Sequence, residues 1–135
     1  MKFYVGSGLQ NRDQVREVAR KLQVIGWNQT YDWTQNERAN NIEDLMLIGT
    51  LEKEAIKDAD YTIILLPGGK GSHIELGMAI ALEKQIFLYS PHGEAMDMET
   101  TSTFYHLPEV NICTGTIDEL ISAIQENSQL EVNNR

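Results

Sequence analysis

The segment that most limits the fold of this chain is an uninterrupted apolar run at residues 61–66, Tyr-Thr-Ile-Ile-Leu-Leu. Pro67, Gly68 and Gly69 follow it directly and predict a loop. A strand with one solvated face alternates apolar and polar residues, and this run does not. We therefore expect a central parallel strand, which requires helices on both faces of its sheet.

Strand-like and helix-like segments alternate along the rest of the chain. Apolar, β-branched or aromatic segments predict strands at residues 2–6, 27–33, 85–90 and 109–113. Helical periodicity predicts helices at residues 11–25, 42–59 and 116–126, and after Ser72 as N-cap. This order predicts an α/β fold, a Rossmann-like or flavodoxin-like open parallel sheet with helices on both faces. The length of 135 residues fits a single domain, expected at residues 1–127, with 128–135 as a polar tail.

Composition excludes several classes of protein. The 20 acidic and 11 basic residues give a net charge of −9, which argues against binding to nucleic-acid polymers. No apolar run approaches the roughly 20 residues of a membrane span. A single cysteine, Cys113, excludes an internal disulfide, and the three histidines lack metal-ligand spacing. We expect a cytoplasmic protein without metal or cofactor, since no signal peptide is visible at the start.

Two glycine-rich loops mark the expected ligand site. Ligands of open parallel sheets bind beyond the carboxyl ends of the strands, where residues 6–8 (Gly-Ser-Gly) and 67–73 are predicted to lie. Glycines there allow close backbone approach to an anionic or polyhydroxyl ligand, and the helix that follows adds free N–H groups. Glu75 stands in this helix, where a carboxylate can attack an anomeric carbon. Alternatively, Ser72 and Glu75 form the Ser-x-x-Glu capping box of that helix.

Three segments together resemble one enzyme family. They are residues 68–77 (Gly-Gly-Lys-Gly-Ser-His-Ile-Glu-Leu-Gly), 4–8 (Tyr-Val-Gly-Ser-Gly) and 31–34 (Tyr-Asp-Trp-Thr). They are similar to the nucleoside 2-deoxyribosyltransferases, a family with a branch of N-glycosidases that hydrolyse 2′-deoxynucleoside 5′-monophosphates. The resemblance covers residues 2–120 in the family's order.

The resemblance implies a catalytic set of three residues. Glu75 matches the glutamate that attacks C1′ of the deoxyribose, expels the base and leaves a covalent deoxyribosyl-enzyme, which a second base or water resolves. Tyr4 matches a tyrosine that orients this glutamate; alternatively, it packs in the core. Glu52 stands where the family carries an acid, usually aspartate, that handles the departing base; alternatively, it is a solvated helix residue.

The resemblance also implies the substrate-binding residues. The Asp that often contacts the sugar six residues before the nucleophile is replaced here by Gly69, so backbone groups, Ser72 and His73 are expected to bind the sugar. An aromatic ring beside a carboxylate suits a nucleobase, although the tryptophans could be packing residues and His73 could face solvent. The expected set is Gly6, Ser7, Asp32, Trp33, Gly69, Gly71, Ser72 and His73.

The implied partners are a nucleoside, nucleotide or nucleobase and further copies of the chain. We expect a homodimer or larger homo-oligomer with a shared active site, which residues 98–105 of a neighbour would complete. Residues 31–60 carry eight acids and three bases, so −5 of the −9 charge lies there and favours a neutral nucleoside over a phosphate ester. The glycine-rich loop also resembles that of nucleotide-binding sensor domains, so ligand binding without turnover is the alternative.

Overall fold

The computed structural model describes residues 1–134 and contains one five-stranded parallel sheet in the order β2-β1-β3-β4-β5. The strands are β1 (Lys2–Ser7), β2 (Asn28–Gln29), β3 (Tyr61–Leu65), β4 (Gln85–Tyr89) and β5 (Val110–Cys113). All five residues of β3 are buried between β1 and β4, which confirms the central strand predicted from its sequence. The order is the flavodoxin-like one, whose switch point lies between β1 and β3.

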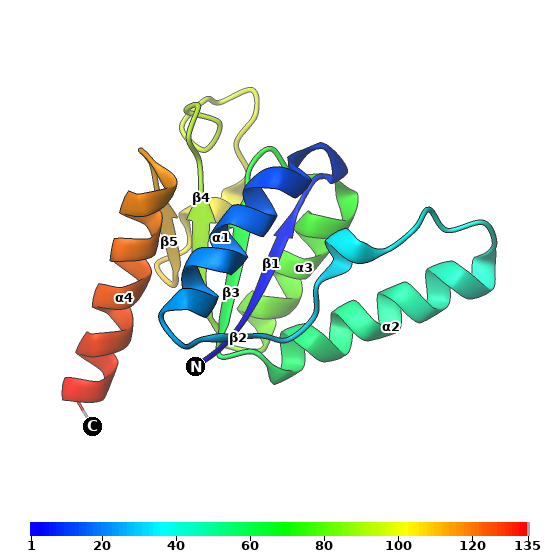
Figure 1. Cartoon of the computed structure of the whole chain (residues 1–135). Helices are drawn as coiled ribbons and strands as arrows, with labels where there is room; N and C mark the ends of the chain where they lie inside the picture. The colour runs from blue at the N-terminus through cyan, green and yellow to red at the C-terminus, as the bar shows by residue number, and fades with distance from the viewer. Residues whose placement is uncertain (135) are drawn as a thin grey trace.

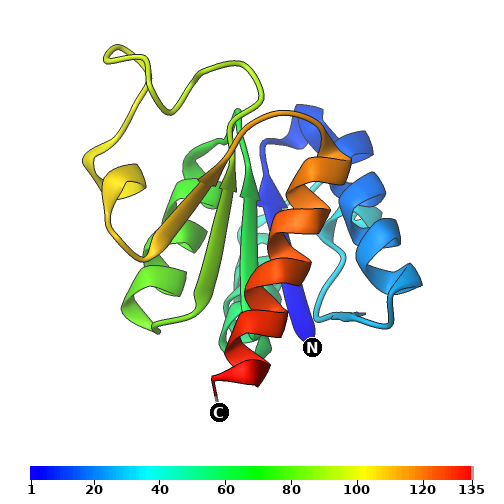
Figure 2. The same cartoon turned by 90° about the vertical axis from the view of Figure 1, so that its left-hand side faces the viewer.

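Four helices cover the two faces of the sheet. They are α1 (Arg12–Val24), α2 (Ile42–Asp58), α3 (Lys70–Ala81) and α4 (Ile117–Asn133). Helices α1 and α4 pack together on one face, and α2 and α3 on the other (Figures 1 and 2). The doubly covered α/β sheet predicted from the alternating segments is thus confirmed. Both glycine-rich loops follow carboxyl ends of neighbouring strands, β1 and β3.

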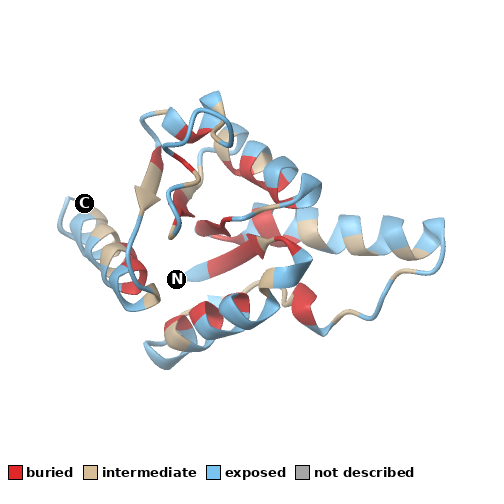
Figure 3. Cartoon of the chain, turned by 90° about the horizontal axis from the view of Figure 1, so that it is seen from above, coloured by how far each residue is buried: buried red, intermediate tan, exposed pale blue. Residues whose placement is uncertain are grey.

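Helix α2 carries many apolar residues, yet it buries few of them against the sheet. Only Ala55 and Ile56, near its C-terminal end, are buried. Its first half extends beyond the sheet, and pale blue exposed residues cover most of it in Figure 3. The exposed side chains there are large and apolar: Ile42, Leu45, Met46, Leu47 and Leu51.

The predicted strand at residues 27–33 is mostly wrong. Only β2, two residues long, pairs with β1 at the sheet edge. The Asp32 side chain accepts a hydrogen bond from the Thr34 backbone N–H and caps a short 3₁₀ helix, η2 (Trp33–Gln35). Such a local side-chain bond competes with strand pairing and turns the chain away from the edge.

Two helix ends also differ from the sequence prediction. Helix α4 continues to Asn133, so residues 128–133 are helical rather than a free polar tail. Its last turns are attached to the sheet, since the Tyr61 hydroxyl lies 2.7 Å from Asn127 Oδ1 and 3.2 Å from Glu131 Oε2. Helix α3 begins at Lys70 with Gly69 as N-cap, and Ser72 is therefore its third residue rather than its cap.

Candidate active site

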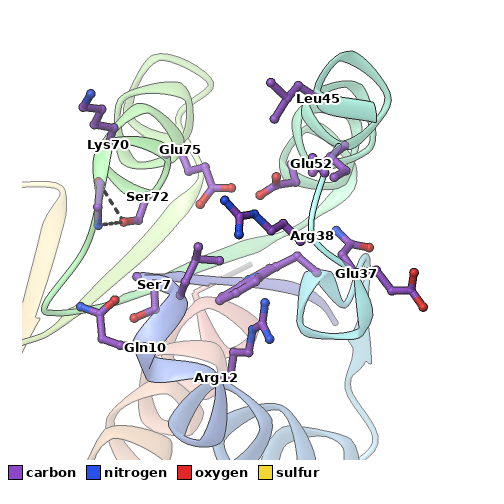
Figure 4. A pocket seen from close by; sticks show the side chains of 18 residues that line it. Ser7, Gln10, Arg12, Glu37, Arg38, Leu45, Glu52, Lys70, Ser72 and Glu75 are labelled. Atoms are coloured by element: carbon purple, nitrogen blue, oxygen red, sulfur yellow. Dashed lines mark hydrogen bonds between the residues drawn. The ribbon is translucent and has the colours of Figure 1, made fainter. Parts of the chain in front are cut away.

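A cavity of about 880 Å³ lies at the carboxyl ends of β1 and β3, between the glycine-rich loops and the protruding half of α2. Figure 4 shows side chains from α1, α2, α3 and the connecting loops directed into it. Seven of the predicted site residues line it: Ser7, Trp33, Glu52, Gly69, Gly71, Ser72 and Glu75. The switch point of the sheet is thus where the open space and the predicted residues coincide.

Glu75 projects from the second turn of α3 toward β1 and is only 7% exposed. Its Oε2 accepts a hydrogen bond from the Tyr4 hydroxyl at 2.5 Å. Gly6, on the same strand, gives the carboxylate its space, because a Cβ there would lie 2.5 Å from Glu75 Oε1. Since α3 begins at Lys70, Glu75 is too far along the helix to form the capping box, and that alternative is wrong.

Glu52 approaches the same tyrosine from α2. The Tyr4 hydroxyl lies 2.8 Å from Glu52 Oε2, so this one oxygen joins two carboxyl groups. A phenol has a single proton to donate. If both contacts are hydrogen bonds, one of the two carboxyl groups must also carry a proton. Tyr4 is fully buried in the core, as the packing interpretation expects, and its hydroxyl faces both carboxyl groups; its role in orienting Glu75 stays a prediction.

Burial changes the titration of this cluster. Loss of hydration, together with the neighbouring Glu52, raises the pKa of Glu75 from 4.5 to about 9, and the Tyr4 hydroxyl opposes that rise. Burial and the two carboxylates also raise the pKa of Tyr4 far above its usual value. The tyrosine therefore stays protonated, and Glu75 holds a proton at neutral pH.

The start of α3 forms one wall of the cavity. The Gly69 backbone N–H donates to Ser72 Oγ at 2.7 Å, and the Ser72 hydroxyl donates back to the Gly69 carbonyl at 3.1 Å. Ser72 therefore holds the glycine turn in place and has no hydroxyl proton left for a ligand. Lys70 and Gly71 lie beside it on the cavity wall.

Trp33 and Asp32 have different positions, although they are neighbours in the chain. Trp33 lines the cavity, and its indole N–H donates to the Val5 carbonyl at 2.7 Å, which fixes the ring against β1. Asp32 does not line the cavity, because its carboxylate caps η2 through Thr34. Of the predicted pair Asp32 and Trp33, only Trp33 reaches the cavity.

The polar side-chain atoms of Ser7 and His73 are engaged in hydrogen bonds within the protein. The Ser7 hydroxyl donates to the Leu65 carbonyl at 2.7 Å and accepts from Asn11, so it connects the ends of β1 and β3. His73 does not line the cavity: its ring nitrogens lie 2.7 Å from the Gly69 carbonyl and 2.6 Å from the buried Tyr105 hydroxyl. Both residues act on the loops that shape the site.

Several lining residues were not predicted as site residues. Leu45 and Ile48 contribute apolar surface from α2, and Gln10, Arg12 and Arg38 contribute polar groups from the loops and α1. The periodicity of α2 signals an apolar face without showing that it borders a cavity. Arg12, by contrast, could have been found, because it follows the loop after the first strand.

The cavity is lined by as many basic as acidic residues, whereas acidic residues are in excess in the whole chain. Arg12, Arg38 and Lys70 line it together with Glu37, Glu52 and Glu75. The excess of acids in residues 31–60 therefore does not make this cavity uniformly acidic. Within residues 1–134 there is no group of three or more His, Cys, Asp or Glu side chains placed to hold a metal ion. In the same part of the chain, no helix combines the length and apolar character needed to span a membrane.

Comparison with known proteins finds solved structures with the same fold. No family model and no curated protein matches the chain. Among solved structures, it is similar to the CMP N-glycosidase BcmB of Clostridium botulinum, with 19% identity and a TM-score of 0.66 over 93% of this chain and 99% of that one. It is also similar to a 2-deoxyribosyltransferase of Bacillus psychrosaccharolyticus, with 23% identity and a TM-score of 0.57 over 75% and 82% of the two chains. The chain has the fold of these two proteins.

The fold is thus the one found in the enzymes that the sequence motifs resemble. One of the two proteins is named for cleaving a nucleotide and the other for transferring deoxyribose. At these identities the likeness concerns the backbone, and the chemistry must be argued from the side chains described above.

Proposed function

We propose that this protein is an enzyme that cleaves the N-glycosidic bond of a nucleoside or nucleoside 5′-monophosphate and passes the sugar to water or to another base. The observation that carries the proposal is the cluster in which the Tyr4 hydroxyl joins Glu75 and Glu52 beside a cavity of nucleoside size. Retaining cleavage of a glycosidic bond uses such a pair, one carboxylate as nucleophile and one carboxylic acid as proton donor.

In the proposed first step, Glu75 acts as the carboxylate and Glu52 as the acid. A Glu75 oxygen bonds to C1′ while the bond from C1′ to the base nitrogen breaks, and its electron pair stays with the base. The base takes up the proton of Glu52. The raised pKa of Glu75 means that its proton must pass to Glu52 before the attack, so that the site holds both the nucleophile and the proton that the reaction needs.

In the second step, water or an incoming base attacks C1′ from the side that the first base has left. The bond between C1′ and Glu75 breaks, Glu75 becomes a carboxylate again, and Glu52 accepts the proton of the attacking group. Tyr4 keeps its proton throughout and donates to Glu75, which orients the carboxylate.

The two ends of the cavity support one orientation of the substrate. Gly69, Gly71 and Lys70 offer backbone N–H groups and a cation, which suit the sugar and any 5′-phosphate. Trp33, Leu45 and Ile48 offer flat and apolar surface, which suits the base. Lys70 and Arg12 offset the acids locally, so we include both nucleosides and their monophosphates among the candidate substrates.

We further propose that the enzyme is a homo-oligomer. Met46, Leu47 and Leu51 on α2, with Ile74 on α3, are large apolar side chains left exposed on the two helices that cover the same face of the sheet. Leu45 belongs both to this face and to the cavity wall, so a second copy packed there would also close the cavity. Residues 98–105 of the neighbour remain the candidate segment.

The proposal is tested by incubating the protein with a panel of nucleosides, deoxynucleosides and their 5′-monophosphates, followed by chromatography for free base. We expect base release by the unaltered protein and none by Glu75→Ala. A new nucleoside formed when a second base is added identifies a transferase, and its absence identifies a hydrolase. Equal release by both proteins would contradict the role of Glu75, and binding without any release would favour a sensor.

A further inference from the structure

Arg38 is the basic lining residue of the cavity that the proposed reaction has not used. It lies in the segment between η2 and α2, and its side chain points into the cavity toward Glu52 and Glu75 (Figure 4). Within residues 1–134 its guanidinium forms no ion pair with either carboxylate. A guanidinium with five N–H donors thus faces the open space between α2 and α3.

The segment that carries Arg38 is attached at both ends. On one side, the Tyr31 hydroxyl donates to Asn36 at 2.8 Å. On the other, Asn41 caps α2 through the Asp44 N–H, and the Asn40 N–H donates to Asp44 at 3.0 Å. These bonds hold the backbone on both sides of Arg38 at the rim of the cavity.

Arg38 lies on the side of the cavity formed by α2, which also carries the apolar lining residues Leu45 and Ile48 (Figure 4). The lining side chains near it in sequence or on the facing helix are Trp33, Leu45 and Ile48, which suit a flat ring. The other two cations of the lining, Arg12 and Lys70, belong to the starts of α1 and α3. Lys70, on α3, and Arg38, beside α2, thus come from opposite sides of the cavity (Figure 4).

Breaking the glycosidic bond creates negative charge on the base, which the proposed orientation places on the side formed by α2. The electron pair of the bond moves to the ring nitrogen of the base and spreads to the neighbouring acceptor atom, a carbonyl oxygen in pyrimidines and a ring nitrogen in purines. Fixed donors aimed at such developing charge lower the barrier strongly. Glu52 supplies a proton to the leaving base but no positive charge.

We propose that Arg38 is a catalytic residue that donates hydrogen bonds to the acceptor atom beside the leaving nitrogen and stabilises the departing base as an anion. The inference rests on the proposed function and deepens it. Arg38 keeps all its protons: the pair from the broken bond stays on the base, Arg38 offsets the charge, and Glu52 then protonates the base. Arg38 therefore matters most for bases that are poor leaving groups.

The test compares Arg38→Met with the unaltered protein on a leaving-group series. One sugar is kept constant, and the base is varied from uracil to 5-fluorouracil, which leaves more readily because its ring N–H is more acidic. We expect kcat for base release to fall roughly 100-fold with the poorer leaving group and clearly less with the better one. Arg38→Lys, which keeps the charge without the planar fork, should be intermediate.

Controls separate failure of this inference from failure of the proposed function. Arg20→Met removes the same charge from an exposed position on α1 outside the cavity and should behave like the unaltered protein. If Arg38→Met releases base as fast as the unaltered protein, or loses the same factor with every leaving group, the role of Arg38 is overturned while the reaction stands. A loss seen only with 5′-monophosphates would overturn it in favour of a phosphate contact. If the unaltered protein releases no base, the proposed function itself fails.

Discussion

A β-carbon on residue 6 would lie 2.5 Å from Oε1 of Glu75, so the carboxylate can lie against β1 only because that strand carries a glycine at this point. Gly6 and Glu75 are on different elements, a strand and a helix, and their contact sets the depth at which the carboxylate is buried. It is this depth that brings Glu75 to the Tyr4 hydroxyl.

Replacing Gly6 with alanine should therefore reduce catalytic activity more than folding stability. The added methyl group must displace the Glu75 carboxylate, and we expect base release to fall by roughly 100-fold, as for other misplaced catalytic groups. Gly49→Ala is the matched control, since nothing lies within 4 Å of a Cβ there and an exposed helical alanine adds about 1 kcal/mol of stability. Normal activity of Gly6→Ala in the base-release assay would contradict this contact.

Tyr4→Phe should move the pH dependence in a defined direction. The Tyr4 hydroxyl lowers the pKa of Glu75, so its removal should raise that pKa above about 9 and further favour the protonated form of Glu75, which cannot attack. We expect kcat at pH 7 to fall roughly 10- to 100-fold and the acidic limb of the pH–rate profile, on which Glu75 must ionise to attack, to move to higher pH. An acidic limb that stays in place or moves to lower pH would show that Tyr4 does not stabilise the Glu75 carboxylate.

Glu75→Gln should make the protein more stable at high pH. Because the pKa of Glu75 is about 9 in the folded protein and 4.5 when the side chain is fully hydrated, the folded state keeps a proton that the unfolded state loses between these values. The stability contributed by Glu75 is complete below pH 4.5 and falls as pH rises toward 9. Glutamine cannot ionise, so we expect a gain of at least about 1 kcal/mol at pH 8 that shrinks near pH 5.

Urea unfolding of both proteins at these two pH values measures the effect. Glu83→Gln, a change at an exposed residue just after α3, is the control for loss of one acidic charge. A stability difference between Glu75→Gln and the unaltered protein that does not change with pH would mean that Glu75 is not a buried acid with a raised pKa.

A charge placed on the apolar face of α2 should break the proposed oligomer. Met46 is 66% exposed and does not line the cavity, so Met46→Glu changes the face without touching the site. We expect sedimentation velocity to show a smaller species and base release to fall with it. Val24→Glu, at a 76% exposed residue on α1, should change neither. If the unaltered protein itself sediments as a monomer, the proposed oligomer is refuted.

The order of the elements was predictable because most of them are determined locally. The apolar run of β3 and the periodicity of α1 identify a buried strand and an amphipathic helix without knowledge of the rest of the chain. The prediction at β2 was wrong because the capping bond of Asp32 overrides the strand preference of the aromatic residues around it. The end of α4 depends on Tyr61, more than 60 positions earlier, which no local pattern reveals.

The sequence motifs predicted which residues gather at the site, but not which partners their side chains bind. Glu75, Tyr4 and Glu52 were expected to act together because the chain resembles a family, and the structure brings them within hydrogen-bond distance. Ser7 and Ser72 look like ligand donors in the sequence, yet their hydroxyls bond to backbone carbonyls. Arg38 gave no signal, since its role depends on where the segment before α2 crosses the cavity.

The most direct test of the proposed chemistry is mass spectrometry of the intact protein after incubation with a 2-deoxy-2-fluoro-arabino nucleoside. The fluorine slows hydrolysis of a glycosyl-enzyme, so a covalent intermediate accumulates. We predict a mass increase equal to one fluorinated sugar residue, located on Glu75 by peptide mapping and absent from Glu75→Gln. Release of the base without any sugar adduct, or an adduct on another residue, would contradict the nucleophilic role of Glu75.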